Sequence, residues 1–443
     1  PPDETGWGRR DAGMPRAWPT LVTVTSRALP LHAGAALVAA VGLALGACSA
    51  SPPAPSAGMS TQQPAGASGA TAASAAPGGG TNATAATPGA AKDGSTVTIA
   101  LTGDVLLHTG VTDQAIKDGT ANPAKASNGM DYRPLLAGAK PFAESADLAI
   151  CNLETPVAPA GGPYSGYPVF SVPQEILPAL VDTGFDACTT ASNHAIDKGI
   201  DGLKRTLDAM DAAGIKHAGT NRSAAEAAGT TMLDAHGVKV ALLGYAYGLN
   251  GLRLPADKPW AVDMIDTAKI LADAKAARAA GAEIVLVALH TGAEYQILPT
   301  DQQKEVAAAL VASPDVDLVY GHHSHVVQPM DKIGGKWIAY GLGNMVAKQH
   351  RLPELVKAQH ELMARFTFTK GSDGRWTVST AEARPAIMSH LNEPLRYLDL
   401  ATLLADPQVS EARKAAYRPF YDRAVKAVTA LGADTKGLVI AGR

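Results

Sequence analysis

The sequence predicts an α/β domain of largely parallel strands with helical crossovers, and three observations point to it. From Thr96 onward, short runs of β-branched residues alternate with amphipathic stretches. Hydrophobic residues make up 46% of the 443-residue chain and charged residues 18%, as in soluble globular proteins. Polar residues gather where one strand after another should end. We therefore expect one large α/β domain over residues 95–395 and a helical extension over 396–443 that packs on it.

The individual elements follow from the same alternation, taken in chain order. Short apolar runs predict strands at 97–101, 147–151, 186–190, 238–244, 283–289 and 317–320. Amphipathic stretches predict helices at 174–182, 200–213, 267–280, 300–311 and, in the tail, 410–431.

Two hairpins are expected after the last of these strands. Gly334-Gly335 predicts a two-residue turn between strands at 326–333 and 336–340. The turn residues 371–374 separate a second pair, 361–369 and 376–380.

The first 94 residues are not expected to belong to the domain. Residues 29–47 are apolar, basic residues precede them, and Leu45-Gly46-Ala47-Cys48 forms a lipobox. This pattern predicts a signal peptide over 1–47, lipidation of Cys48 and an exported protein anchored on the outer face of the cytoplasmic membrane. A transmembrane anchor with an incidental cysteine is the alternative. Residues 48–94 are almost entirely Ala, Gly, Pro, Ser and Thr, which predicts a disordered tether.

Cys151 and Cys188 are the cysteines of the predicted domain, and each lies in an apolar run. Such a position favours a small buried side chain on a strand. Export would also permit a disulfide if the two strands are neighbours, and the sequence leaves both interpretations open. The formal charge of -3 provides no broad basic field, so nucleic acid is not an expected partner.

Potential metal ligands follow five of the predicted strands. In a parallel α/β sheet the loops after the strands converge on one edge, and ligands bind there. A pair of divalent cations needs a bridging carboxylate and further oxygen and nitrogen ligands. The predicted metal ligands are Asp104, Glu154, Asn193, His290, His323 and His325. The sequence does not identify the metal, and Mn, Zn, Fe and Mg all remain open.

The remaining polar residues of these loops have other predicted roles. His194 and Asp197 are the predicted catalytic residues, because an imidazole ordinarily titrates near neutral pH and is suited to general acid chemistry. Residues predicted to face the substrate or support the ligands are Glu294, Tyr295, His322, Gln328 and Asn344.

Each of these residues also has an ordinary structural interpretation. A single Asp at a strand end often caps a turn, and Asp197 is placed to cap the helix that begins near Ile200. His290 alone is compatible with a hydrogen-bonded core histidine. The convergence of ligands at five strand ends favours the metal site over these alternatives.

The order of the motifs resembles one known family. Along the chain stand Gly-Asp, Asn-Leu-Glu, Asn-His-x-x-Asp-x-Gly, His-x-Gly-x-Glu-Tyr, Gly-His-His-x-His-Val-x-Gln and Tyr-x-Leu-Gly-Asn. From about Val97 to Ala347 this order resembles the CapA family, which is associated with poly-γ-glutamate capsule synthesis. That family is similar to calcineurin-like metallophosphoesterases. The resemblance therefore implies a β-sandwich flanked by helices, with the site at the carboxyl ends of the strands.

The resemblance also implies roles for individual residues. Asp104 corresponds to the first metal carboxylate, Glu154 to the bridging ligand, and Asn193 and His290 to ligands of a second metal. The final histidine pair is His323 and His325, and His194 resembles the catalytic histidine. One departure is clear: Val105 and Leu106 follow Asp104, so the Asp-x-His of metallophosphoesterases is absent. One metal position therefore loses a histidine, and a single-metal site is also compatible with the sequence.

Three functions remain open at this point. The leading hypothesis is a metal-dependent hydrolase or transferase that acts on an acidic envelope polymer such as poly-γ-glutamate. The alternatives are a non-catalytic, polymer-binding lipoprotein and a metal-dependent phosphoesterase. The expected partners are the polymer, the membrane through the lipid anchor, and membrane proteins of capsule synthesis.

Overall fold

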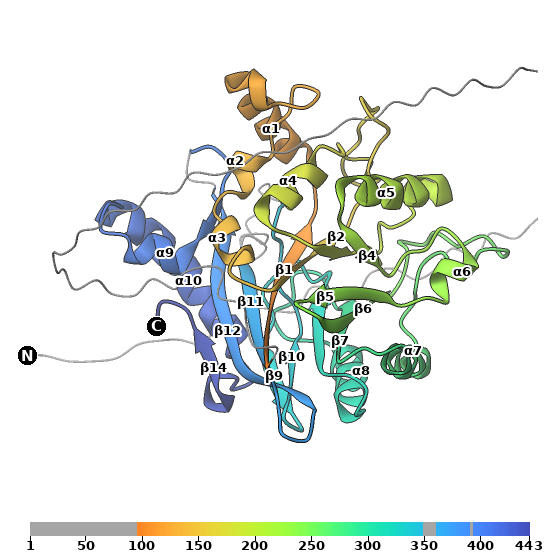
Figure 1. Cartoon of the computed structure of the whole chain (residues 1–443). Coiled ribbons are helices and arrows are strands. Elements are labelled where there is room, and N and C mark those ends of the chain that lie inside the picture. The colour runs from red at the N-terminus through yellow and green to blue at the C-terminus, as the bar shows by residue number, and fades with distance from the viewer. Residues whose placement is uncertain (1–94, 349–359, 390–392) are drawn as a thin grey trace, which may run out of the picture. The chain divides into compact units, whose positions relative to one another are not determined.

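The computed structural model describes residues 95–348, 360–389 and 393–443 (Figure 1). The predicted signal peptide, the predicted lipidation site Cys48 and the predicted tether lie outside the described residues. None of the helices in the described ranges combines the length and the apolar character needed to cross a membrane.

The strands divide between two sheets. The larger sheet has the order β13-β12-β11-β1-β2-β3-β4, and its eighth strand, β14, also pairs with β12. Its strands β1 to β4 are parallel, whereas β11, β12 and β13 join in antiparallel fashion. The bounds are Thr96–Val105 (β1), Leu148–Leu153 (β2), Ala187–Thr189 (β3), Lys216–Ala218 (β4), His360–Lys370 (β11), Trp376–Met388 (β12), Tyr397–Asp399 (β13) and Leu438–Ile440 (β14).

The second sheet has the order β5-β6-β7-β8-β10-β9. The four central strands are parallel, and an antiparallel strand closes each edge. The bounds are Thr231–Ala235 (β5), Val238–Ala246 (β6), Ile284–His290 (β7), Leu318–His322 (β8), Met330–Ile333 (β9) and Lys336–Ala339 (β10).

The two sheets pack face to face, as the alternation of side chains shows. Ile99 of β1 shares one buried apolar cluster with Val240 of β6, whereas their neighbours Ala100 and Ala241 join two different clusters on the outer faces. The predicted α/β fold, a β-sandwich flanked by helices, is confirmed.

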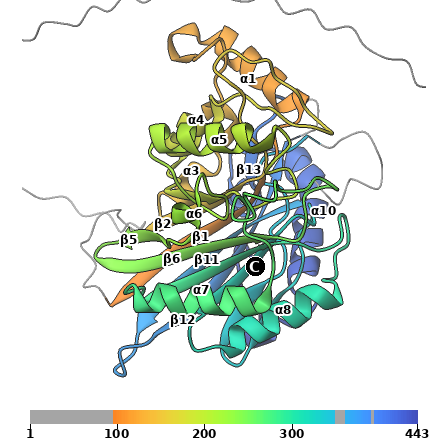
Figure 2. The same ribbon diagram turned by 90° about the vertical axis from the view of Figure 1, so that its right-hand side faces the viewer.

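Helices cover both outer faces of the sandwich (Figure 2). The larger sheet carries α1 (Thr109–Ala121), α2 (Arg133–Leu136), α3 (Lys140–Ala143), α4 (Ile176–Thr183) and α5 (Gly199–Ala213). The smaller sheet carries α7 (Thr267–Ala279) and α8 (Asp301–Ala312), and the short α6 spans Ala224–Ala227. Local sequence sets the ends of these helices. Thr300 and Gln303 form a capping box at the start of α8, and Gly184 ends α4 in the left-handed conformation.

The C-terminal segment contributes strands as well as helices. It contains α9 (Leu400–Ala405) and α10 (Glu411–Val428), and it adds β13 and β14 to the larger sheet. Buried side chains of α10, including Tyr417, join the core between the sheets. Residues 396–443 are therefore integral to the sandwich.

One predicted strand is shorter than expected. The run 326–333 forms a strand only from Met330, because Pro329 has no N–H with which to continue the ladder. The sequence does not predict the elements α1, α2, α3, α6, α9, β4, β5, β13 and β14, and β12 runs to Met388, beyond its predicted end at 380.

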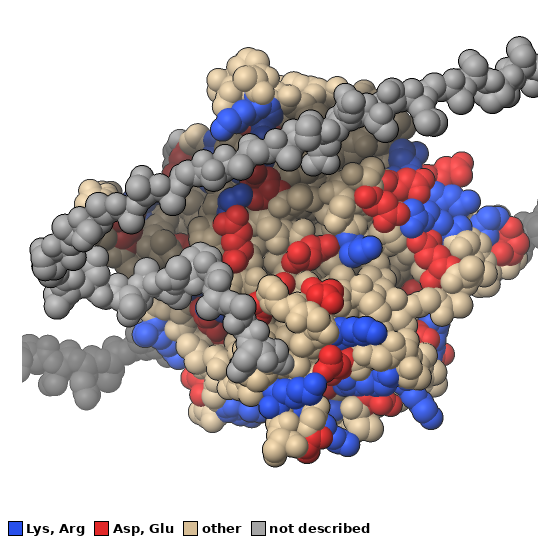
Figure 3. All heavy atoms as spheres, in the orientation of Figure 1, with Lys and Arg blue, Asp and Glu red and all other residues tan. Residues whose placement is uncertain are grey.

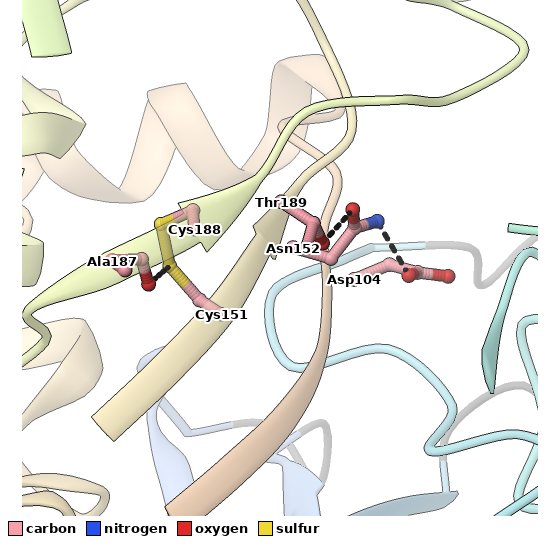
Figure 4. Close-up of a disulfide and its surroundings, with 6 residues drawn as sticks. All are labelled: Asp104, Cys151, Asn152, Ala187, Cys188 and Thr189. Carbon is pink, nitrogen blue, oxygen red and sulfur yellow. Dashed lines mark hydrogen bonds between the residues drawn. A yellow bond between two sulfur atoms is a disulfide. The ribbon is translucent and has the colours of Figure 1, made fainter. Parts of the chain in front are cut away.

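The two cysteines form a disulfide (Figure 4). Cys151 and Cys188 face each other in the parallel register of β2 and β3, with their Cα atoms 4.4 Å apart. Both are fully buried, so the pair is at once apolar core and covalent link between neighbouring strands.

Candidate metal centre

The ends of strands from both sheets bring the predicted site together. Asp104 lies near the end of β1, and Glu154 directly follows β2. His290 and His322 are the last residues of β7 and β8. Parallel strands present their carboxyl ends at one edge, so side chains that are distant in sequence meet there.

Asp104 is fully buried and held from several sides. Its Oδ1 accepts a hydrogen bond from Asn152 Nδ2 at 2.9 Å, and its Oδ2 accepts one from the backbone N–H of His323 at 3.2 Å. Burial alone would raise the pKa of Asp104, but the neighbouring His322 and His325 bring that pKa well below its ordinary value. Asp104 is therefore a charged, fixed carboxylate.

The carboxyl group of Glu154 is buried without any hydrogen-bond partner. Its exposed fraction is 1%, and neither carboxylate oxygen has a partner. The nearest imidazole nitrogens are Nε2 of His290 at 3.8 Å and Nε2 of His325 at 3.9 Å from Oε1. Burial raises the pKa of Glu154 well above its ordinary value. An unpartnered buried carboxyl is costly, and a cation in contact with it would remove that cost.

Asn193 and His290 meet from opposite sheets. Nε2 of His290 lies 2.8 Å from Oδ1 of Asn193, which follows β3. Burial lowers the pKa of His290 well below its ordinary value, so its ring is neutral and has a lone pair for a metal.

His323 and His325 occupy an unusual stretch of backbone. Their φ angles are 84° and 54°, in the left-handed region that side chains other than glycine rarely adopt. Burial lowers the pKa of His323 to about 4. Burial would also lower the pKa of His325, but the carboxylates of Glu154 and Asp104 raise it to about 9. The two rings therefore differ in charge at neutral pH.

Two groups of these side chains have ligand atoms close enough for a cation. Asp104, Glu154 and His325 each offer one atom, and these atoms lie within 4.8 Å of one another. Glu294, His323 and His325 satisfy the same condition, and Glu294 is exposed. The donor set of carboxylate, amide and imidazole groups and the unpartnered Glu154 both fit a divalent cation.

The position of the missing histidine is apolar. Leu106 is 2% exposed and belongs to the cluster on the outer face of the larger sheet. It contributes no ligand, so the Asp104 position has one imidazole fewer than the Asp-x-His pattern supplies.

The predicted catalytic pair is in direct contact. Nδ1 of His194 lies 2.7 Å from Oδ2 of Asp197, and the same oxygen accepts the backbone N–H of Phe170 at 2.8 Å. The ring of Phe170 packs edge-on against His194 with centroids 4.8 Å apart. Asp197 and Phe170 together fix the orientation of the imidazole.

The residues predicted to support the ligands have distinct environments. His322 is buried with Nδ1 3.0 Å from Asp104 Oδ1, but neither ring nitrogen makes a hydrogen bond of good geometry. Oδ1 of Asn344 lies 2.9 Å from Nδ1 of His325. The backbone N–H of Tyr295 donates to Ser324, and its ring lies 5.9 Å from that of His325.

Gln328 does not join the cluster. Its side chain donates to the carbonyl of Gln296 at 2.9 Å and accepts from Gln303 at 2.8 Å. Both ends of the amide are used in these hydrogen bonds, so Gln328 supports the loop that carries Glu294 and Tyr295.

Three further residues of the site have no role assigned from the sequence, and one of them, Asn152, belongs to the Asn-Leu-Glu motif. Asn152 links Thr189 to Asp104 by hydrogen bonds (Figure 4), and its place two residues before Glu154 on the same face of the strand was the available signal. Tyr247 packs on His323 with ring centroids 4.5 Å apart, and Asn250 contacts Asn193. These two lie in a loop without a motif, and the sequence carries no sign of their approach.

Comparisons with known proteins agree with the motif order. Residues 98–349 match the family described as bacterial capsule synthesis protein PGA_cap. The PGA biosynthesis protein CapA of Bacillus subtilis is 30% identical over 226 residues, which cover 48% of this chain and 56% of the relative. The capsule biosynthesis protein CapA of Bacillus anthracis is 26% identical over 267 residues, which cover 58% and 61%. The chain thus matches less than two thirds of the length of either relative.

A likeness to solved structures was also found. The calcineurin-like phosphoesterase YfkN of Bacillus subtilis aligns over 75% of this chain and 98% of its own, with 14% sequence identity and a TM-score of 0.41.

Proposed function

The chain belongs to the bacterial capsule synthesis protein PGA_cap family, and from that premise we propose that it is a metal-dependent hydrolase or transferase acting on an acidic envelope polymer. Relatives named for PGA and capsule biosynthesis make poly-γ-glutamate the first candidate substrate. We further propose that the protein is exported, lipidated at Cys48 and held at the cell envelope, where such a polymer is accessible.

The observation that carries the proposal is the environment of Glu154. A bound cation would stabilise a carboxyl group whose two oxygens are buried and unpartnered beside Asp104 and several imidazoles. A purely structural role would have supplied a donor to those oxygens.

The residues divide the work of binding and proton transfer. Asp104, Glu154 and His325 would hold one divalent cation. Asn193 and His290, which are in contact, would serve a second together with His323, whose ring lies 5.1 Å from that of His290. A bound cation supplies Lewis-acid activation of water and neutralises charge on the reacting group.

His194 is the residue for proton transfer. Asp197 engages Nδ1 of the His194 ring, which leaves Nε2 as the atom that gives a proton to the leaving group. Burial of the carboxylates and the imidazoles excludes bulk water from these contacts, which strengthens them.

The surface is consistent with local recognition of an acidic chain. Figure 3 shows acidic and basic side chains interspersed over the face that it displays. The formal charge of -3 supplies no long-range attraction for a polyanion. Recognition of a polycarboxylate would therefore depend on the cations of the site.

The test measures metal and turnover together. The full-length protein, His194→Ala and His325→Ala are purified, and bound metal is quantified by inductively coupled plasma mass spectrometry. Each is then assayed on poly-γ-glutamate and on bis(p-nitrophenyl) phosphate. His236→Asn is the control, because His236 lies in the β5–β6 turn with a side chain 65% exposed. Asn also tolerates its positive φ of 54°.

The outcomes separate three functions. We expect both site variants to lose turnover of the polymer, His325→Ala to lose metal as well, and His236→Asn to match the unaltered protein. Cleavage of the phosphodiester alone would replace the polymer with a phosphate ester as substrate. Polymer binding without turnover by a metal-free protein would contradict the proposal and favour a binding lipoprotein.

A further inference from the structure

The loop after β6 reaches across the site from the smaller sheet to the larger one. Asn250 lies in this loop, and its Oδ1 accepts a hydrogen bond from Nδ2 of Asn193 at 3.1 Å. Its Nδ2 lies 3.5 Å from both ring nitrogens of His194. One side chain from the smaller sheet therefore contacts both a candidate ligand and the candidate acid that follow β3.

We propose that Asn250 is a positioning residue that fixes the amide orientation of Asn193 for metal binding. This inference rests on the function proposed above and assigns to that site a residue outside its ligand set. A primary amide has an oxygen that binds cations and a nitrogen that does not, and only its hydrogen bonds decide which end faces the site. Asn250 holds the nitrogen of Asn193, so the oxygen faces His290 Nε2 at 2.8 Å.

Asparagine at position 250 could be needed either for its positive φ or for its side-chain hydrogen bond, and the backbone conformation distinguishes the two. Its φ is 51°, and asparagine and glycine both adopt this conformation readily. Gly251 follows with a φ of 80°, so the turn already contains one glycine. A glycine at position 250 would adopt the same φ but could not make the hydrogen bond to Asn193. The amide side chain is therefore needed only for that hydrogen bond. Asn250→Gly therefore removes the contact without imposing strain.

The position of Asn250 also explains how two separate strand ends keep a common geometry. Asn193 belongs to the connection after β3 in the larger sheet, and His290 ends β7 in the smaller one. The hydrogen bond with Asn250 links Asn193 to the loop after β6, which belongs to the same sheet as His290. Groups that orient metal ligands in this way usually change metal affinity by about 10-fold to 100-fold when they are removed.

The experiment is a double-mutant cycle read by metal affinity. Binding of Mn²⁺, and of Zn²⁺ in parallel, is measured by isothermal titration calorimetry for the unaltered protein, Asn250→Gly, Asn193→Asp and the double variant. A carboxylate at 193 presents oxygen on both sides, so it has no wrong orientation. Asn250→Asp keeps the acceptor for Asn193, and Leu252→Ala, 49% exposed in the same loop, is the matched control. Chemical unfolding of each metal-free variant is measured alongside.

We expect Asn250→Gly to weaken Mn²⁺ binding about 10-fold in the native background and to have no such effect in the Asn193→Asp background. Asn250→Asp, which keeps the acceptor for Asn193, should bind Mn²⁺ more tightly than Asn250→Gly does, and Leu252→Ala should bind within about threefold of the unaltered protein, a margin well below the effect of a lost orienting group. An equal loss in both backgrounds would show that Asn250 acts on the fold in general, and the inference would be wrong. Unchanged binding by Asn250→Gly would also overturn it while leaving the metal site intact. Absence of binding by the unaltered protein would overturn the metal site itself, and with it this inference.

Discussion

Nδ1 of His194 and Oδ2 of Asp197 lie 2.7 Å apart, three positions from each other on the connection between β3 and α5. The same Asp197 oxygen also accepts a hydrogen bond from the backbone N–H of Phe170, and this bond fixes the orientation of the carboxylate. The two residues form a preorganised pair, and the other ring nitrogen, Nε2, lies 3.5 Å from Nδ2 of Asn250.

Replacing Asp197 by Asn should reduce turnover and leave metal binding unchanged. The amide keeps the size of the carboxylate but loses the charge that orients and stabilises a protonated His194. General acid catalysis contributes about 10²-fold to 10⁴-fold, and we expect a loss of at least about 10-fold in kcat. The measurements are steady-state kinetics on the substrate that the unaltered protein cleaves and metal content by mass spectrometry. Loss of metal in Asp197→Asn would contradict a role confined to His194.

Metal affinity should rise with pH because His325 must lose a proton to become a ligand. Its pKa is raised to about 9 by Glu154 and Asp104, against the effect of burial, whereas the pKa of His323 is lowered to about 4. Between these values His323 is already neutral, whereas His325 must release a proton, as must Glu154, whose pKa burial also raises. For one displaced proton the Mn²⁺ dissociation constant should fall about 10-fold per pH unit from about pH 6.5 to 8.5.

The same pKa of His325 gives a stability prediction for the metal-free protein. A raised folded-state pKa contributes stability that is present below the unfolded value near 6.5 and is lost as the pH rises through about 9. Urea unfolding of the metal-free protein at several pH values measures this stability.

The pH dependence of metal affinity is checked separately. Calorimetry in buffers of different ionisation enthalpy measures the proton release on Mn²⁺ binding. His325→Gln should reduce that proton release. Affinity that stays constant over this pH range would contradict the prediction.

A methyl group at Gly103 should disturb the site through the backbone. A Cβ there would lie 2.1 Å from the carbonyl oxygen of Gly343, which also accepts the N–H of Asp104 at 2.9 Å. Gly103→Ala must push these two segments apart, which moves Asp104 and the His325 partner Asn344. We expect a loss of about 1–3 kcal/mol in the free energy of unfolding and weaker Mn²⁺ binding. Gly248→Ala, with no atom within 4 Å of the added Cβ, is the control and should be neutral.

The sequence predicts whether a segment is a helix or a strand where the segment is strongly buried, but it does not predict which strands pair. Every residue of β2 and of β7 is buried, so both read as apolar runs, and nothing in such a run shows which sheet it joins. The strand β4 has three residues and begins with Lys216 and His217, too short and too polar to be recognised.

Within the site, the sequence likewise predicts the residues that follow strands but not the contacts that depend on how the sheets pack. Ligands at strand ends could be anticipated, because the polar residue directly follows an apolar run that is itself visible. Asn250 reaches Asn193 only because the two sheets pack together, and no local pattern records that contact.

The disulfide between Cys151 and Cys188 should stabilise the protein in an oxidising environment. The two residues occupy the same level of neighbouring parallel strands, and their bond closes a loop between positions 37 apart in sequence. A closed loop of that length is worth about 2–4 kcal/mol in the free energy of unfolding. We expect Cys151→Ala/Cys188→Ala to lose about that amount, and a reducing agent to destabilise the unaltered protein but not the double variant. Peptide mapping without reduction should recover the two cysteines in one linked peptide. Two free thiols in protein exported to an oxidising compartment would contradict the bond, since disulfides persist in such compartments.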